Sequence, residues 1–366
     1  MDFSLIFRPS LRVPEAIMNG DLIIEDGTLY DFLDLASRNF HHLEAQPLAR
    51  LLSWLDPARL GQRNPARQAR RNVAHHYDLS GELYNLFLDR DLEYSCAYFP
   101  DDERDLEQAQ HAKKRHIASK LLLKPGQKVL DIGCGWGGLA LYLASIADVE
   151  VTGITLSVEQ VEVARRRAAE AGLADRVSFR LRDYRDETAT YDRIVSVGMF
   201  EHVGRQGQVE FFDTVRYLLN DDGVMLLHSI GRFDGPAPIN PFIRKYIFPG
   251  SDLPALSEVM GAVEPTGLFT TDIELLRLHY AETLRLWRER FTKQRDKAAE
   301  IYDARFVRMW ELYLIICELG FRHQNLMVFQ MQLSKQLDGV PLTRDYMLDW
   351  ERRQAKDETK RDQRAA

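Results

Sequence analysis

The amino-acid sequence predicts an α/β fold: a doubly wound, seven-stranded sheet with helical insertions, preceded by a small N-terminal domain. Two observations predict it. After residue 125, short apolar runs alternate with helical segments, which is the pattern of a sheet covered by helices on both faces. At 128–138 an apolar run around Asp131 leads directly into a glycine-rich turn, the usual passage from strand to helix in such a sheet. With 366 residues, 45% of them hydrophobic, the chain is long enough for two domains.

The small N-terminal domain is expected over residues 1–58. Residues 21–25 are predicted to form a strand and 26–27 a turn, and Thr28 is predicted to cap a helix over 29–40.

A polar connector follows at 59–71. It carries five arginines at helical spacing: Arg59, Arg63, Arg67, Arg70 and Arg71. Two interpretations of this arginine face stay open, a solvated helix surface or a patch for anionic lipid headgroups.

The second domain is expected over residues 72–350. Its strands are predicted at 128–132, 149–154, 176–180, 192–197, 223–229, 268–278 and 326–333. A helix over 158–171 is closed by Gly172. Two insertions, 232–265 and 281–322, interrupt the alternation, and the first contains apolar residues that look exposed: Phe242, Ile243, Tyr246, Ile247 and Phe248. Residues 351–366 are expected to be a charged, frayed tail.

The glycine turn is the strongest indication of a ligand. Gly133, Gly135 and Gly138 satisfy the dinucleotide pattern Gly-x-Gly-x-x-Gly, so a nicotinamide cofactor has to be considered. Asp131, just before the first glycine, suits the amino end of a methionine-like ligand. About 20 residues further on, where NAD requires an acid, the chain reads Gly153-Ile-Thr-Leu-Ser157. S-adenosylmethionine therefore fits better than NAD.

Polar side chains follow the predicted strands at the edge where ligands gather in such a sheet. They are Asp131, Thr155, Asp183, Glu201, His228 and Tyr280. Cys96 lies in an aromatic segment, 94–99, that could cover the same edge. Each residue taken alone is better explained as an ordinary core residue, but their convergence favours a site.

Composition excludes several classes of protein. A net charge of −7 disfavours a general nucleic-acid binder. No apolar run reaches about 18 residues and no signal peptide is recognisable. The three cysteines, Cys96, Cys134 and Cys317, form no Cys-x-x-Cys pair, which indicates a reducing cytoplasm. No metal site is expected, because no four ligands stand at a recognisable spacing.

Taken together, these segments closely resemble the cyclopropane-fatty-acyl-phospholipid synthases and the related mycolic acid cyclopropane synthases. The resemblance is carried by His75-His-Tyr-Asp-Leu79, Tyr94-Ser-Cys-Ala-Tyr-Phe99, Asp131-Ile-Gly-Cys-Gly-Trp-Gly-Gly138, Gly153-Ile-Thr-Leu-Ser157, Arg193-Ile-Val-Ser-Val-Gly-Met-Phe-Glu-His202, His228-Ser-Ile230 and His279-Tyr-Ala-Glu-Thr-Leu284. The N-terminal stretch 20–30 resembles the small N-terminal domain of the phospholipid enzymes, which the mycolic acid enzymes lack. This favours a phospholipid as the substrate.

The resemblance implies a class I methyltransferase (Rossmann-like) fold and a role for each motif. S-adenosylmethionine would be held by Tyr77, Gly133, Gly135, Thr155, Leu156 and Gln160, with Thr155 and Gln160 in place of the usual ribose acid. Asp183 and Tyr184 would lie near the adenine. A bicarbonate ion would be held by Cys96, Glu201, His228, the backbone of Ile230, and Tyr280.

The expected activity is the addition of a methylene group across a cis double bond of a phospholipid acyl chain, through a carbocation. A dry site with aromatic faces would protect the cation, with Tyr94, Tyr98, Phe99 and Phe200 as candidates. The two insertions would form the walls of an acyl channel. The chain is expected to be a homodimer that acts peripherally on the cytoplasmic face of a bilayer with unsaturated acyl chains. The alternatives are a relative that methylates the alkene without closing the ring, and a non-catalytic lipid-binding relative.

Overall fold

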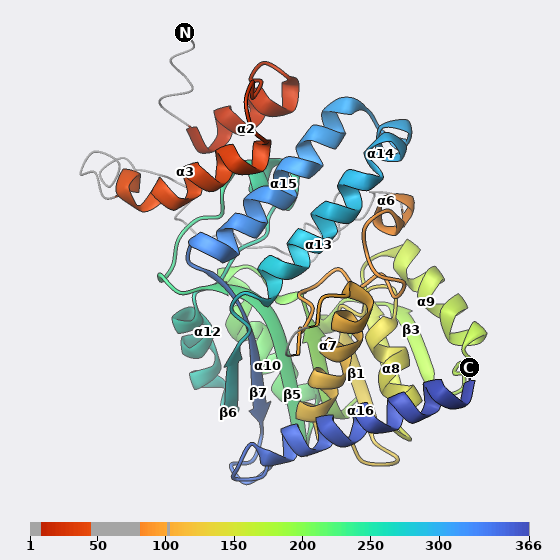
Figure 1. Ribbon diagram of the computed structural model, residues 1–366. Helices are drawn as coiled ribbons and strands as arrows, with labels where there is room; N and C mark the ends of the chain where they lie inside the picture. Colours follow the sequence, from red (N-terminus) through yellow and green to blue (C-terminus); the bar gives the residue numbers. More distant parts are fainter. Residues whose placement is uncertain (1–8, 45–80, 101–102, 366) are drawn as a thin grey trace.

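A computed structural model of the chain describes residues 9–44, 81–100 and 103–365 (Figure 1). Its centre is a seven-stranded sheet in the order β3-β2-β1-β4-β5-β7-β6. The strands are β1 (Lys128–Ile132), β2 (Glu150–Thr155), β3 (Val177–Leu181), β4 (Tyr191–Val197), β5 (Leu219–Arg232), β6 (Phe269–Leu275) and β7 (Leu326–Ser334). Five strands pair in parallel, and β7 runs antiparallel between β5 and β6. The predicted doubly wound, seven-stranded sheet is confirmed.

Helices cover both faces of the sheet. The first face is covered by α7 (Leu106–Leu121), α8 (Gly138–Ile146) and α9 (Val158–Glu170), and the second by α10 (Gln208–Leu218) and α12 (Leu256–Val263). Alternate residues of β1 point to opposite faces: Val129 packs in the first core, while Leu130 and Ile132 pack in the second, around Phe211 and Phe212. The apolar runs of the central strands β1 and β4 are therefore buried on both sides, as is typical of parallel sheets.

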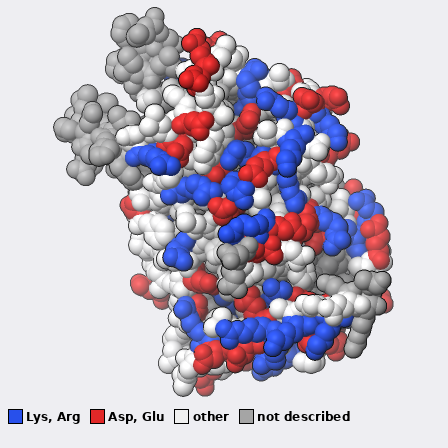
Figure 2. Space-filling view, viewed as in Figure 1, with Lys and Arg blue, Asp and Glu red and all other residues white. Residues whose placement is uncertain are grey.

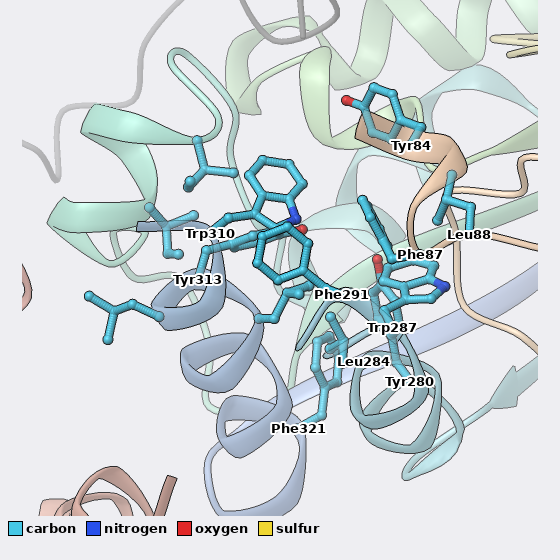
Figure 3. Packing of buried hydrophobic residues seen from close by; sticks show 14 of the residues in the cluster. Tyr84, Phe87, Leu88, Tyr280, Leu284, Trp287, Phe291, Trp310, Tyr313 and Phe321 are labelled. Atoms are coloured by element: carbon cyan, nitrogen blue, oxygen red, sulfur yellow. The ribbon is translucent and has the colours of Figure 1, made fainter. Parts of the chain in front are cut away.

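A third layer caps the carboxyl edge of the sheet. It consists of α13 (His279–Lys293), α14 (Arg295–Ile301) and α15 (Ala304–His323), with the short helices α6 (Gly81–Asn85) and α11 (Pro241–Tyr246) beside them. Figure 3 shows its core, in which aromatic side chains of α13, including Trp287 and Phe291, lie beside Trp310 and Tyr313 of α15. Ring centroids in this cluster lie about 5–6 Å apart, for example 6.0 Å between Phe87 and Trp287, the separation that aromatic pairs prefer.

The described part of the N-terminal domain packs onto this cap. Helices α2 (Pro9–Asn19) and α3 (Leu29–Glu44) both contact α15. Thr28 caps α3 as predicted, since its hydroxyl accepts from the Asp31 N–H and donates to the Asp31 carboxylate. The strand predicted at 21–25 is wrong: these residues form bends. Among the described residues they pair with no strand of the sheet, and an unpaired strand leaves its backbone groups without partners.

The domain boundary at 58, the arginine connector 59–71 and Tyr77 lie outside the described residues. For these positions the expectations of the sequence stay predictions.

Two further expectations were wrong. The apolar residues of the first insertion are not exposed: Phe242, Ile243 and Ile247 are buried, because Asn240 caps α11 and turns its apolar face into the cap layer. Tyr246 and Phe248 are partly buried against the same layer.

The C-terminal residues do not fray either. They belong to α16 (Asp345–Ala365), which packs along α7. Glu358 on α16 accepts hydrogen bonds from Tyr142 at 2.6 Å and from Arg115 at 2.7 Å. These partners come from distant parts of the chain, so the charge pattern of the tail alone could not reveal them.

The face shown in Figure 2 has no continuous patch of charges of one sign, because basic and acidic side chains alternate over α16 and the cap layer. Within the described ranges, no helix combines the length and the apolar composition needed to cross a bilayer.

Candidate active site

The glycine turn after β1 opens onto a cavity of about 570 Å³ at the carboxyl edge of the sheet. Gly133 and Gly135 have φ of +83° and +52°, a region that L-residues with side chains rarely adopt. A Cβ on Gly135 would meet no protein atom within 4 Å, so this backbone faces open space. The cavity has the size of a site for a nucleoside-sized ligand.

All of the predicted cofactor-binding residues that the structure describes line this cavity. They are Asp131, Gly133, Gly135, Thr155, Leu156, Gln160, Asp183 and Tyr184. They come from the ends of β1, β2 and β3, so the parallel sheet brings together residues that lie up to about fifty positions apart.

Asp131 is the most distinctive group of the cavity. It is buried, and its Oδ2 has no hydrogen-bond partner among the described residues. Burial raises the pKa of Asp131 to about 8, nearby Glu93 adds to the rise, and Lys113 acts in the opposite direction. A buried, unpaired carboxylate is costly. The sequence-based prediction that Asp131 binds the amino group of a methionine-like ligand would supply the donor that this oxygen lacks.

The cavity lining after β2 and β3 holds one neutral polar pair and one ion pair. Thr155 donates its hydroxyl to Gln160 Oε1 at 2.7 Å, which leaves the Gln160 amide N–H groups as the donors toward a ribose. Asp183 has both carboxylate oxygens engaged by the Arg185 guanidinium, at 2.9 and 2.7 Å. Asp183 therefore orients Arg185, whose guanidinium lies 5.3 Å from the ring centroid of Tyr184.

A second cavity, of about 100 Å³, adjoins the first. Both are lined by Tyr94, Ser95, Gly198 and His202. The second cavity contains every residue expected to hold an anion: Cys96, Glu201, His228, Ile230 and Tyr280. Most of its remaining wall is apolar and comes from the two insertions and β7: Ile239, Ile243, Phe248, Leu253, Phe321, Leu326 and Val328.

Glu201 lies on a 3₁₀ turn (Phe200–His202) directly after β4. Its Oε1 accepts the Ile230 N–H at 2.6 Å, and its Oε2 is buried without a partner among the described residues. Burial raises the pKa of Glu201 to about 7, and the Ile230 hydrogen bond offsets only part of this rise. The Ile230 N–H thus orients Glu201. Direct contact between this N–H and an anion stays a prediction.

The sequence analysis placed His228 and Tyr280 at the ends of strands, and this placement was wrong. His228 lies within β5, opposite Gln330 of β7, and burial lowers the pKa of its imidazole well below the ordinary value. Strand β6 stops at Leu275, and Arg277, at a left-handed φ of +37°, turns the chain into α13, whose first turn carries Tyr280. Both side chains still reach the cavity.

The Cys96 side chain is a neutral thiol in this setting. It is buried and lies 3.3 Å from the Ala97 carbonyl oxygen, to which it donates. Burial raises the pKa of this thiol above its ordinary value. It can donate a hydrogen bond but is a poor nucleophile.

Only one of the four expected aromatic faces lines the cavities. Tyr94 lines both, held by a 2.7 Å hydrogen bond to the Tyr313 hydroxyl. The expectation for Tyr98, Phe99 and Phe200 was wrong. Tyr98 and Phe99 stack on His279, and Phe200 packs against the aromatic side chains of α10.

The sequence also missed residues that the cavities need. Lys113 on α7 is fully buried and donates to Ser95 Oγ at 2.8 Å and to Glu93. Its charge lowers the pKa of both Asp131, which lines the first cavity, and His228, which lines the second. Nothing in the sequence around it separates Lys113 from its exposed-looking neighbours. Trp136, within the glycine turn, adds an aromatic face to the first cavity.

Comparison with known proteins agrees with this geometry. The family model "Mycolic acid cyclopropane synthetase" matches residues 64–331. The cyclopropane-fatty-acyl-phospholipid synthase of Escherichia coli (strain K12) is 43% identical over 264 residues, which are 72% of this chain and 68% of that protein. A probable fatty acid methyltransferase of Pseudomonas putida is 41% identical over 287 residues, 75% of this chain and 73% of that protein. The crystal structure of mycolic acid cyclopropane synthase CmaA1 complexed with SAH and CTAB has a TM-score of 0.69 at 34% identity, and the match covers 72% of this chain and 97% of that one.

Proposed function

The chain belongs to the mycolic acid cyclopropane synthetase family and is an S-adenosylmethionine-dependent enzyme of the cyclopropane synthase type. From this premise we propose that it adds a methylene group across a cis double bond of a phospholipid acyl chain. We further propose that a bound bicarbonate ion is the base. One observation carries the proposal, namely two adjoining cavities. In the first, an Asp131 oxygen has no partner among the described residues, and the second gathers Cys96, Glu201, His228 and Tyr280.

The first cavity fits S-adenosylmethionine. Asp131 would bind the amino group, the turn at Gly133 and Gly135 would pass the ligand along the backbone, and Gln160 would donate to the ribose. When bound, S-adenosylmethionine supplies an electrophilic methyl group. The residues of the first cavity would bind and orient it, and the second cavity, which shares part of the same lining, would hold the alkene.

The second cavity suits the later part of the reaction. Addition of a methyl group to the alkene leaves a positive charge on the acyl chain, and apolar walls keep water from trapping it. The ring of Tyr94, common to both cavities, can stabilise such a charge. One proton must then leave the new methyl group as the ring closes.

The polar residues of the second cavity favour a small anion as the acceptor of that proton. His228, Cys96 and Tyr280 are neutral donors, and hydrogen bonds to a charged acceptor are stronger than bonds between neutral groups. The free Oε2 of Glu201 can accept a hydrogen bond from the hydroxyl of bicarbonate. These four groups together would position the ion.

A phospholipid substrate is supported by the name of the Escherichia coli relative and by the apolar wall of the second cavity. Moving roughly ten methylenes from a bilayer into water would cost about 8 kcal/mol, at about 0.8 kcal/mol each. The acyl chain should therefore pass directly from the bilayer into the protein. We accordingly propose peripheral association with the cytoplasmic face of the membrane, aided by the arginines of 59–71, and a homodimeric state.

A second candidate function is methylation without ring closure. The Pseudomonas putida relative, a probable fatty acid methyltransferase, is nearly as similar to this chain as the synthase is. The two outcomes differ only in the fate of one proton. A non-catalytic lipid-binding role is disfavoured, because Cys96, Glu201 and Tyr280 are all present.

Turnover of the full-length enzyme on vesicles of cis-unsaturated phospholipid tests the proposal. We expect a cyclopropane product by gas chromatography–mass spectrometry, a rate that falls in bicarbonate-depleted buffer, and recovery on titration of the ion. Glu201→Gln and Tyr280→Phe should slow turnover about 10- to 150-fold, the loss of one hydrogen bond to a charged group. Added bicarbonate should partly restore both, while the affinity for S-adenosylmethionine stays unchanged.

The matched control is Tyr217→Phe, because Tyr217 is 65% exposed and lines neither cavity. An enzyme indifferent to bicarbonate would reject the proposed base. A methylated, uncyclised product would establish the second candidate function instead.

A further inference from the structure

We propose that Gln330 and Lys120 are positioning residues that hold His228 in the tautomer with its proton on Nε2, so that this N–H donates to the anion in the second cavity. The inference deepens the proposed function, because it names what orients one of the anion-holding groups. The tautomer itself follows from hydrogen-bond geometry and does not depend on the identity of the anion.

The side-chain amide of Gln330 has only one consistent orientation. Gln330 is 1% exposed and lies on β7 directly opposite His228. Its Oε1 is 2.6 Å from the ammonium nitrogen of Lys120, and its Nε2 is 3.1 Å from His228 Nδ1. An ammonium group can only donate, so the amide oxygen must face Lys120. The usual ambiguity between the two ends of a glutamine amide is thereby removed.

This orientation decides the protonation of His228. The amide nitrogen of Gln330 is a donor, so Nδ1 must be the acceptor and can carry no proton. Burial keeps the imidazole neutral by lowering its pKa. A neutral imidazole carries one proton, which must therefore be on Nε2. Nε2 is the remaining polar atom of a side chain that lines the second cavity.

Lys120 is held as a donor by a half-buried acidic neighbour. Its ammonium group contacts Glu274, which also lies 2.7 Å from His116 Nε2. Burial works to raise the pKa of Glu274, but His116 and Lys120 outweigh it and hold that pKa well below the ordinary value. Burial lowers the pKa of Lys120, and the ionised Glu274 opposes this shift and favours the ammonium form. With Lys120 as an ammonium, the direction of each hydrogen bond is set from Glu274 to His228.

The chain of contacts continues to the surface helix α16. His116 Nδ1 lies 3.1 Å from Glu351 of α16, and the ring of Tyr98 stacks on His116 at 4.0 Å. This explains why Tyr98, expected at the cavity, lies outside it: it supports the hydrogen-bonded chain that reaches His228.

The first test is a spectroscopic measurement on the wild-type protein. In selectively ¹⁵N-histidine-labelled protein, the two ring nitrogens of His228 are assigned by their absence from a His228→Asn variant. We expect a protonated Nε2 and an unprotonated Nδ1. A proton on Nδ1, or on both nitrogens, overturns the inference without any variant of Gln330.

The second test changes the donor into an acceptor without changing its shape. Gln330→Glu keeps an oxygen for Lys120 but presents a carboxylate to His228, so the proton should move to Nδ1. Turnover should fall about 10- to 150-fold, and the affinity for S-adenosylmethionine should not change. Movement of the proton with an unchanged rate would overturn the positioning role.

Gln332→Glu is the matched control. Gln332 lies two residues along the same strand, is also 1% exposed, and bonds to the Lys120 carbonyl and Tyr346, not to His228. The Gln332→Glu variant should retain the Nε2 tautomer and most of the wild-type rate. A loss of rate equal to that of Gln330→Glu would assign the effect to a buried carboxylate in general and overturn the inference. If the wild-type enzyme proves indifferent to bicarbonate while His228 carries its proton on Nε2, the proposed base fails and the tautomer assignment stands.

Discussion

Replacement of Asp131 by asparagine should weaken the binding of S-adenosylmethionine and, at the same time, stabilise the ligand-free protein at pH 8. Both effects come from one feature, a buried carboxylate whose Oδ2 has no partner among the described residues. In Asp131→Asn the shape is kept, but the negative charge that would meet the ligand's ammonium group is lost.

The expected loss of affinity is that of one hydrogen bond between charged groups. Such a bond contributes about 1.5–3 kcal/mol, so the dissociation constant should rise about 10- to 150-fold. The pKa of Asp131, raised to about 8 by burial and by Glu93, adds a pH dependence. The carboxylate must ionise to meet the ammonium group, so wild-type affinity should increase as the pH rises toward 8, and that of the variant should not.

The stability of the ligand-free protein should change in the opposite sense. The pKa of Asp131 is higher in the folded protein than its ordinary value of 3.8. Its favourable contribution is therefore fully present below about pH 4 and is lost as the pH rises toward 8. Asparagine carries no charge at any pH and avoids this loss. An unpaired buried polar group costs about 1–3 kcal/mol, so the variant should melt a few degrees above the wild type at pH 8.

Titration calorimetry with S-adenosylmethionine, and thermal melting between pH 5 and pH 9 without ligand, would measure both effects. Asp192→Asn is the control, because the Asp192 carboxylate accepts from Lys128 N–H and Asn220 at the far end of the neighbouring strand. Unchanged affinity in Asp131→Asn would refute its role in binding. A melting temperature no higher than that of the wild type at pH 8 would refute the unpaired charge.

Three other changes have definite expected outcomes. Gly135→Ala should weaken S-adenosylmethionine binding at least tenfold in calorimetry. Gly172→Ala is the control, because Gly172 has a similarly left-handed φ and equally open space around it. It should carry the same backbone strain of about 1–2 kcal/mol without loss of affinity. Glu358→Ala should lower the melting temperature by several degrees at pH 7. Burial works to raise the pKa of Glu358, but the hydrogen bonds from Tyr142 and Arg115 outweigh it and lower that pKa. The difference in melting temperature between wild type and variant should therefore vanish as the pH falls through the lowered pKa. Changing Arg63, Arg67 and Arg70 of the connector to glutamate should weaken co-sedimentation with anionic vesicles, most strongly at low ionic strength. Unchanged co-sedimentation would support the interpretation of the connector as a solvated helix surface.

Local patterns in the sequence determined the sheet and the position of its first ligand. The seven strands were predicted within a few residues, except that β5 begins earlier and ends later and β6 is shorter, because each strand is a short apolar run bounded by turn residues. The glycine turn, the acid before it and the missing ribose acid indicated S-adenosylmethionine without any tertiary information. The order of the Cys96, Glu201, His228 and Tyr280 motifs also sufficed to name the family.

Only the tertiary structure decided which of these groups are charged, oriented or buried. Lys113 and Lys120 look like surface lysines of an ordinary helix, yet both are buried, because Glu93 and Glu274 meet them there. Gln330 meets His228 across 102 residues of sequence and Lys120 across 210. Burial of a polar side chain depends on a partner supplied from elsewhere in the chain, and no local periodicity records that partner. For this reason the sequence could indicate S-adenosylmethionine, whereas the proposed proton position on His228 followed only from the folded protein.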